Sequence, residues 1–284
     1  MENLTPLTPT VKVFDSKVNE SYPRFVLKNL QDLRDYRFAI YNFVLNSLRM
    51  RYRRSVLGFV WSLLNPLLVM TVISLVFSVI FKQEVRSFAI YIFSGLAPWS
   101  FISQAIQGGG QSIVFSEGFL KKVYLPKLLF PVVFVTTETI NFIFSLVSLF
   151  ILALLLGSDQ VSWRSVYLPF AIIITYIFVL GCVTLLSVAM VYFRDLSQII
   201  MVLFSALFYL VPILYPLDMI PREFHTLYLI NPLYYFIMLF RKVIYEKGPM
   251  TSGDWLIPLA IGIVTLAIGL FFLMKQDRDI IYRL

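Results

Sequence analysis

The sequence predicts an all-α protein that crosses a membrane several times, and composition and run length are the observations behind this prediction. Of the 284 residues, 59% are hydrophobic and only 14% are charged, whereas soluble domains carry roughly 45–50% apolar and about 25% charged residues. Six apolar runs are about 20 residues long, the length that an α-helix needs to cross a ~30 Å hydrocarbon core. We therefore expect six transmembrane helices.

The predicted spans are separated by short polar, glycine-containing or proline-containing segments. They cover about residues 59–81, 88–107, 131–156, 166–192, 196–215 and 255–274. The second run stops at three consecutive glycines, Gly108 to Gly110, which we interpret as a helix terminator. The transmembrane domain as a whole is predicted over 30–274, between tails at 1–29 and 275–284.

The distribution of basic residues predicts the orientation of these spans. If the N-terminus lies inside, 17 of the 24 Lys and Arg residues fall in inside segments and 7 in outside segments, as the positive-inside rule requires. Residues 1–30 show no apolar stretch before a small-residue cleavage site, so we expect no cleaved signal peptide. Both termini are therefore expected in the cytoplasm. Cationic inner loops also account for the net charge of +8, and we predict no nucleic-acid partner.

An amphipathic helix is predicted before the first span. Seven apolar residues between Leu33 and Tyr52 recur at helical spacing, and polar residues occupy another face. We expect this helix, over 30–54, to lie along the inner membrane surface. A plain surface anchor is an alternative interpretation of the same pattern.

The segment 212–250 is apolar but cannot form one continuous helix. Four prolines interrupt it, at Pro212, Pro216, Pro221 and Pro232. We predict two short helices over 224–245 that are hinged at Asn231-Pro232 and dip into the outer leaflet. Non-helical backbone at that depth is tolerated only beside protein or a water-filled cavity, which indicates a pathway nearby.

Several kinds of chemistry are excluded by what the sequence lacks. It contains no Gly-Lys dipeptide, so a GxxxxGK[ST] phosphate-binding loop is missing. The single Cys182 and single His225 rule out a disulfide within the chain and a site rich in cysteine or histidine. Glu138 lies inside a predicted span, where we expect it to be hydrogen-bonded to a neighbouring helix or to face a wet cavity; a coupling-ion role is the alternative. The sequence predicts no enzyme, metal or cofactor.

A series of short motifs resembles the permeases of ABC-2 type transporters, above all the Wzm-like branch that exports O-antigen, capsule and teichoic-acid polymers. The first is RMRYRRSVLGFVWSLLNP at 49–66. It is followed in order by SGLAPW at 94–99, EGFLKKVYLPKLLFP at 117–131, FRD at 193–195 and NP at 231–232. Together the motifs cover about residues 25–284, and their order is more specific than any one of them.

This resemblance implies the permease subunit of an ATP-driven exporter in the bacterial inner membrane. Such a permease forms a homodimer, binds two copies of a separate ATPase subunit that carries ATP and Mg²⁺, and encloses a channel for a lipid-linked polysaccharide. By position, 33–52 would be the interface helix, 111–127 the coupling element, and 217–245 the outer gate around Asn231 and Pro232. The residues expected to dock on the ATPase are Glu117, Phe119, Leu120, Lys121 and Lys122. A plain solvated loop is the alternative for this segment.

Two groups of residues are candidates for contact with the substrate. Four arginines next to the first span could bind its diphosphate with their guanidinium forks: Arg49, Arg51, Arg53 and Arg54. Contact with anionic lipid is the alternative for them. Aromatic rings could line the channel and let sugar rings slide, and the candidates are Trp61, Phe77, Phe204, Phe208 and Tyr209. We expect Tyr91, Trp99 and Trp255 in the interfacial aromatic belts.

Other functions are compatible with parts of the pattern. An ABC-2 exporter of a small lipid or drug would share the spans and the inner loop. A membrane-bound enzyme of envelope synthesis would need a cluster of carboxylates or histidines, which the sequence does not show. A secondary transporter would need inverted repeats and paired charges within the spans.

Overall fold

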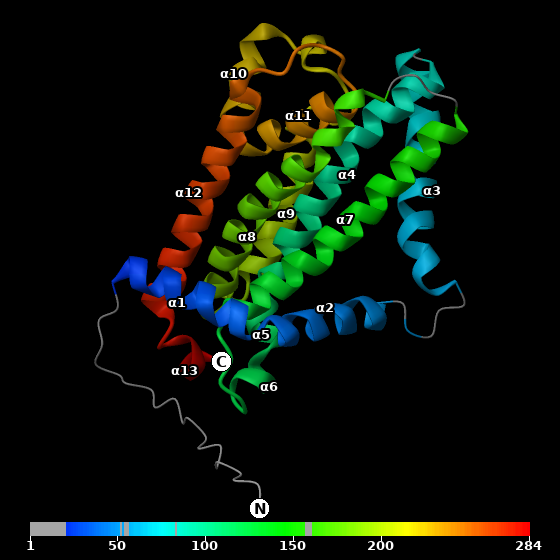
Figure 1. The fold of residues 1–284 in the computed structure, drawn as a ribbon. Coiled ribbons are helices and arrows are strands. Elements are labelled where there is room, and N and C mark those ends of the chain that lie inside the picture. Colours follow the sequence, from blue (N-terminus) through cyan, green and yellow to red (C-terminus); the bar gives the residue numbers. More distant parts are fainter. Residues whose placement is uncertain (1–20, 52, 54–56, 83, 157–160) are drawn as a thin grey trace, which may run out of the picture.

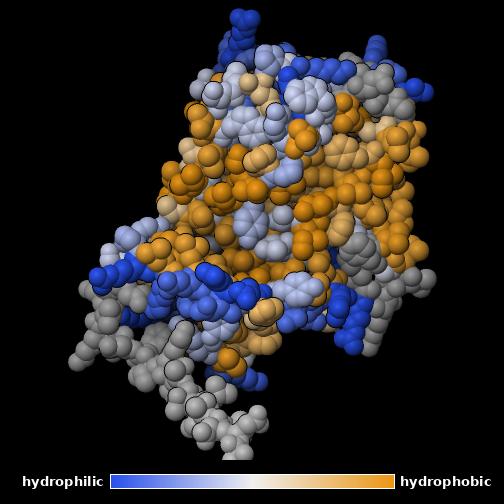
Figure 2. All heavy atoms as spheres, viewed as in Figure 1, coloured by the Kyte–Doolittle hydropathy of each residue, from blue (hydrophilic) through white to orange (hydrophobic). Residues whose placement is uncertain are grey.

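The computed structural model describes residues 21–51, 53, 57–82, 84–156 and 161–284, and this part of the chain consists of helices joined by loops, without strands. Figure 1 shows long helices running between two ends of the molecule. The α6 end carries α1, α2, α5, α6 and α13, and the α10 end carries α10 and the loops beside it. In Figure 2 a wide band of hydrophobic surface separates hydrophilic surfaces at these two ends, as expected for a protein that crosses a membrane.

Five helices are long and apolar enough to cross a membrane. They are α3 (Trp61–Phe81), α4 (Val85–Gly109), α7 (Leu129–Leu155), α8 (Leu168–Tyr192) and α12 (Ser252–Gln276). They confirm five of the six predicted spans, with boundaries within about four residues of those expected. The chain leaves α12 at the α6 end, where α13 (Ile280–Arg283) and α1 also lie (Figure 1).

The fifth predicted span, 196–215, is not a single transmembrane helix. Helix α9 covers only Leu196–Tyr209, 14 residues, or about 21 Å at 1.5 Å per residue, against the ~30 Å of a hydrocarbon core. The helix stops because Pro212 lacks an N–H and disfavours the helical conformation of Val211 before it. The six predicted spans are thus five, or six only if the bent pair α10–α11 is counted as one.

The predicted amphipathic helix is two helices, α1 (Tyr22–Asp35) and α2 (Arg37–Arg51). The first begins at Tyr22 rather than at residue 30, so the boundary of the N-terminal tail at 29 is wrong. Pro23 stands in the first turn, where its missing N–H leaves no hydrogen bond unmade. Phe43 and Val44 turn toward a core cluster that includes residues of α7 and α8. The apolar face therefore packs on the protein itself.

Close helix packing depends on glycines. A Cβ on Gly181 of α8 would lie 2.4 Å from the backbone nitrogen of Leu266 in α12. As predicted, α4 ends in the triple glycine, with Gly110 as its C-cap and with Gly108 and Gly109 as its last two residues. A Cβ on these two would lie 2.6 Å from Phe134 of α7 and 2.7 Å from Val183 of α8, respectively. The glycines let α4 approach both helices.

The remaining elements are short and lie at the two ends. At the α6 end they are α5 (Ser112–Phe115), α6 (Glu117–Leu120) and η1 (Gly58–Val60). Elsewhere they are η2 (Trp163–Tyr167), η3 (Leu217–Met219), η4 (Arg222–Phe224), α10 (His225–Ile230) and α11 (Pro232–Ile244). Segments η4–α10 and α11 meet at an angle of 96°. The predicted hinge at Asn231-Pro232 is confirmed: the Asn231 side chain accepts a hydrogen bond from the Leu233 N–H at 3.0 Å and caps α11.

Candidate functional site

A groove of about 600 Å³ opens between α3, α4 and α7. Aliphatic residues of α3 and α4 form part of its wall, but polar side chains from four helices line the rest. These are Arg51 of α2, Ser62 and Asn65 of α3, Ser100 and Gln104 of α4, and Asn141 and Ser145 of α7. Polar groups at this depth are costly unless water, protein or a ligand satisfies them. The groove is therefore the strongest candidate for a pathway.

Arg51, which lines the groove, forms an ion pair with Glu138 of α7. Arg51 Nη1 donates to both carboxylate oxygens of Glu138, at 2.9 and 3.2 Å, and the amide of Asn141 donates to the same carboxylate at 3.3 Å. The predicted hydrogen bond from Glu138 to a neighbouring helix is confirmed. The Arg51 side chain is 42% exposed and that of Glu138 13%, so the pair contributes only roughly 0–1 kcal/mol to stability. Its main effect is to hold a guanidinium at the groove.

The other predicted arginines do not gather with Arg51. Arg49 and Arg53 are exposed on the surface, and Arg53 reaches only the sulfur of Met50, at 3.7 Å. Arg54 lies outside the described residues. The structure therefore brings one of the three described arginines to the groove.

Helices α3 and α7 are joined beside the groove by one hydrogen bond between them. Ser148 Oγ donates to the carbonyl of Leu63 at 3.0 Å. About two turns before Ser148 on α7, the Asn141 Oδ1 atom is buried and has no partner in the part of the chain that the structure describes. This oxygen can accept a hydrogen bond from a ligand hydroxyl or from water.

The predicted docking residues lie on and just after the short helix α6 at the α6 end. Glu117 and Lys121 pair with each other at 2.6 Å, and the hydrogen bond and charge of Lys121 hold the pKa of Glu117 below its usual range. Phe119 is half exposed and meets the edge of Phe43 in α2, with ring centroids 5.5 Å apart. Leu120 is buried in the core cluster under α6 and anchors the helix, while Lys122 is exposed.

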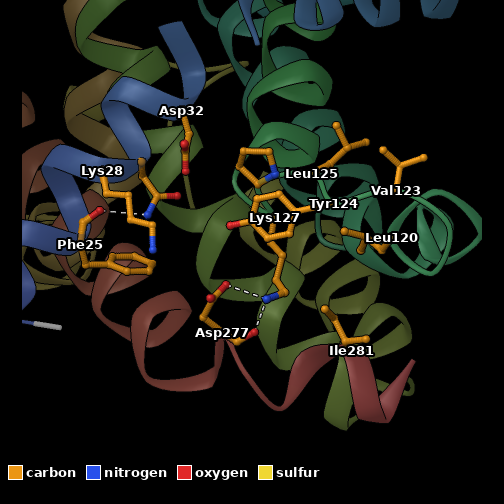
Figure 3. A pocket seen from close by; sticks show the side chains of 12 residues that line it. Phe25, Lys28, Asp32, Leu120, Val123, Tyr124, Leu125, Lys127, Asp277 and Ile281 are labelled. Atoms are coloured by element: carbon orange, nitrogen blue, oxygen red, sulfur yellow. Dashed lines mark hydrogen bonds and ion pairs between the residues drawn. The ribbon is translucent and has the colours of Figure 1, made fainter. Parts of the chain in front are cut away.

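The segment after α6 is tied to the end of α12. In Figure 3, Lys127 and Asp277 pair directly with each other beside a small pocket that residues of α1 also line. Lys127 Nζ lies 2.7 Å from Asp277 Oδ1 and also donates to the Asp277 carbonyl, and the Lys127 side chain is almost fully buried. The pocket, about 40 Å³, has room for a water or two. A displacement of α6 would thus reach α12 through this ion pair.

The aromatic candidates fall into two environments. Trp61 lines the groove and Tyr209 is largely exposed. Phe204 and Phe208 pack on Trp99, with ring centroids 5.8 and 5.7 Å away. Phe77 is partly buried against the core.

The predicted belt positions are wrong for two of three residues. Trp99 and Tyr91 are buried, because both lie on the part of α4 that packs inside the protein. Trp255 begins α12 and packs edge-on against Tyr167 at 6.1 Å, in a position compatible with a belt.

Sequence reasoning missed several residues of these sites. Phe115 is 75% exposed four positions before Phe119 and extends the apolar surface of the loop. That i, i+4 spacing was a usable signal. Ser100 and Gln104 share the same spacing on α4 and face the groove together. Hydroxyl and amide groups within a span are a weaker signal of function than charges, because they cost less to bury.

The sequence profile described as ABC-2 type transporter matches residues 40–245, most of the chain and all of the groove. The chain belongs to the ABC-2 type transporter family. It is 31% identical to the O-antigen export system permease protein RfbA of Myxococcus xanthus over 85% of this chain and 93% of that one. It is 27% identical to the RfbA permease of Klebsiella pneumoniae over 80% and 88%, and 22% identical to the polysialic acid transport protein KpsM of Escherichia coli over 82% and 92%.

Family membership fixes the broad class of the molecule. This ABC-2 chain is a multi-pass membrane transport subunit, and its family works with a partner ATPase. Each of the three relatives matches along nearly its whole length, so the resemblance is not confined to one motif.

Proposed function

We propose that this chain is the channel-forming permease of an ATP-driven exporter that moves a lipid-linked, O-antigen-like polysaccharide across the bacterial inner membrane. The observation that carries the proposal is the polar groove between α3, α4 and α7, with an arginine at one end. The names of the relatives supply the class of cargo.

The groove suits a polymer better than a small hydrophobic molecule. Hydroxyl and amide groups, as on Asn65, Ser100 and Gln104, exchange hydrogen bonds with sugar hydroxyls and with water at similar strength. A row of such groups lets a chain slide, because no position holds it tightly. Trp61 adds an aromatic face on the same wall.

The guanidinium of Arg51 suits the phosphate groups of a lipid carrier. Its planar fork can form two parallel hydrogen bonds to phosphate oxygens. It already pairs with a carboxylate, since its Nη1 atom donates to both oxygens of Glu138, at 2.9 and 3.2 Å. A diphosphate would take the place of that carboxylate at the mouth of the groove.

The cytoplasmic face that we assign to the permease decides where its partner subunits would bind. We place the α6 end in the cytoplasm, where both tails would lie, together with two ATPase subunits that carry ATP and Mg²⁺. Phe115, Phe119, Glu117, Lys121 and Lys122 would dock on the ATPase. A second copy of the chain would complete the channel, and the bent segment around Asn231 and Pro232 would form its outer gate. The permease itself would catalyse no reaction.

The substrate site is tested in proteoliposomes that contain the permease and its ATPase. Arg51→Ala should lower the stimulation of ATP hydrolysis by lipid-linked polysaccharide about tenfold, the loss expected for a charged hydrogen bond of about 1.5 kcal/mol. Arg49→Ala, two residues away and exposed, is the matched control and should behave like the parent. Equal stimulation in the parent and in Arg51→Ala would reject the phosphate role. Equal stimulation of the parent by the lipid diphosphate without sugar would instead favour a lipid exporter.

Docking on the ATPase is tested by the same preparation. Phe119→Ala should leave the permease folded but reduce polymer export per ATP hydrolysed, because the exposed ring would no longer fill a groove on the partner. Lys82→Ala, at the far end of α3, is the control. Export per ATP at the parental level in Phe119→Ala would show that α6 is only a solvated loop.

A further inference from the structure

The outer half of the molecule contains a buried arginine that the groove does not use. Arg241, near the end of α11, is only 3% exposed and is surrounded by the main apolar core. Among the described residues it forms no ion pair with a carboxylate within 4 Å. Burying a charge without a paired carboxylate costs free energy of folding, so other hydrogen bonds of the guanidinium must offset this cost.

Those hydrogen bonds go to the non-helical backbone that follows α9. Arg241 Nη1 donates to the carbonyl of Pro212 at 2.7 Å, and Nη2 donates to that of Ile213 at 2.9 Å. Val211, Pro212 and Ile213 are all buried. Because α9 stops short of crossing the membrane, these carbonyls have no helical partner, and in a bilayer each must be satisfied by protein. One guanidinium fork satisfies both.

Helix α4 provides the space and the third contact. The guanidinium lies over the ring of Tyr91, 4.0 Å from its centroid, a contact that stabilises a cation away from water. Four residues on, Gly95 faces the same group: a Cβ there would lie 2.8 Å from Arg241 Nη2. The glycine of the SGLAPW motif is therefore needed because the guanidinium occupies the place of its side chain. We call Tyr91, Gly95, Pro212, Ile213 and Arg241 the Arg241 junction.

The bent outer segment differs on the two sides of its hinge. Helix α11, which carries Arg241, buries eight of its residues. Before the hinge, η3, η4 and α10 bury none. The far end of α11 is held as well, since the Ser162 N–H donates to the Ile244 carbonyl at 2.7 Å. One arm is built into the core and the other lies on its surface.

We propose that Arg241 is a positioning residue. It fixes α11 and the buried backbone of residues 211–213, which follows α9, to α4, so that these three parts move as one body. On the proposed export function, on which this inference rests, opening the exit displaces only the arm before the hinge. Movement of α4 at the groove then reaches the outer barrier directly. Without the guanidinium, the carbonyls of Pro212 and Ile213 lose their hydrogen-bond partners, and residues 211–213 separate from α11.

The experiment combines two readouts on variants of the full chain assembled with its ATPase. A cysteine replaces Ile213, which is fully buried, in a Cys182→Ser background, and a membrane-impermeant maleimide is added to intact cells. In Arg241→Met the cysteine should become at least fivefold more reactive, and polymer export should fall at least tenfold while ATP hydrolysis stays within twofold. Arg222→Met, an exposed arginine of the same outer segment, is the matched control and should change neither.

Gly95→Ala tests the junction without removing the charge. The added methyl group should push the guanidinium away, so this variant should lose export in the same direction as Arg241→Met but less. In the Arg241→Met background it should cause no further loss, because the colliding group is absent. This variant also decides the question if Arg241→Met does not accumulate in the membrane.

Three results would overturn the proposal. The first is parental export in a folded Arg241→Met protein. The second is parental export in Arg241→Met although its cysteine at 213 has become reactive, and the third is fully additive losses from Gly95→Ala and Arg241→Met. Failure of the proposed function is recognised separately, because the parent protein would then not restore polymer export to a strain that lacks it. The reactivity of the cysteine at 213 would still report whether Arg241 holds the segment.

Discussion

Helices α3 and α4 follow each other in the chain and pack side by side, yet their surroundings are opposite. In α4, 89% of the most apolar window is buried inside the protein, but in α3 only 17% is. The buried helix is the more polar of the two, since it carries Ser94, Ser100 and Gln104 along with its glycines. The exposed helix α3 is the more apolar of the two, and the side chains on its exposed face, such as Val72, Val76 and Val79, are aliphatic. In a bilayer the exterior must be apolar, so polarity marks the inside, the reverse of a soluble protein.

The difference also shows where function is located. The buried helix α4 contributes to both sites. Ser100 and Gln104 line the groove, and Tyr91 and Gly95 belong to the Arg241 junction. Helix α4 therefore connects the groove to the Arg241 junction. The aliphatic outer face of α3 requires only lipid or the second copy that we propose.

The largest expected effect comes from truncating a side chain in the core of α4. Phe93→Ala removes a fully buried ring, and we expect a loss of about 3 kcal/mol in the free energy of unfolding, the low end for phenylalanine because the unfolded chain still contacts lipid. Val72→Ala, on the exposed face of α3, should cost less than about 0.5 kcal/mol. Unfolding in detergent mixtures measures both. Similar losses would mean that the two helices have similar surroundings after all.

A smaller effect is expected where α4 approaches α8. Gly109→Ala would bring a Cβ to 2.7 Å from Val183, and relieving this overlap should cost about 1–3 kcal/mol. Gly118→Ala in α6 has open space around it and should be neutral or slightly stabilising, which makes it the control. Thermal unfolding of the two variants distinguishes tight packing from a general effect of losing glycine.

The polar side of α4 is expected to affect transport more than stability. Gln104→Leu removes an exposed amide from the groove and should lower polymer-stimulated ATP hydrolysis about fivefold, the equivalent of one neutral hydrogen bond of about 1 kcal/mol. The unfolding temperature should stay the same. An unchanged ATPase response combined with a lower unfolding temperature would make Gln104 a packing residue.

The smallest effect is expected at the exposed ion pair of α6. Because Lys121 lowers the pKa of Glu117 in the folded state, the pair stabilises the fold above the usual carboxyl pKa, and the contribution disappears as the pH falls through the lowered value. Glu117→Gln should therefore unfold slightly below the parent at neutral pH. The two should become indistinguishable once the pH lies below the lowered pKa of Glu117. A difference that persists there would have a cause other than the charge.

Much of the fold could be predicted from runs of apolar residues. Five predicted spans, α3, α4, α7, α8 and α12, begin and end within about three residues of the expected positions, because a helix in lipid needs an uninterrupted run. The prediction failed at α9, where the run is apolar through residue 215 but Pro212 and the residue before it cannot be helical. Apolarity predicts the environment of a segment, and proline decides its conformation.

The candidate site was predictable only as separate residues. Arg51 and Glu138 were each recognised from sequence, but they lie 87 positions apart and nothing in their local patterns pairs them. Arg241 lies between the fifth and sixth predicted spans, so the sequence places it among the seven outside cations. Its burial depends on three segments far apart in the chain, which no local pattern reveals.

The amino-acid sequence by itself determined the membrane environment, the approximate positions of five long apolar helices, and the absence of a GxxxxGK[ST] motif. These follow from composition and run length, which act locally. Only the tertiary structure decided which helices are enclosed, which polar groups share a groove, and which carbonyls need the guanidinium of Arg241. Those depend on distances between remote residues, and a bilayer makes them decisive because it offers an unpaired polar group no water.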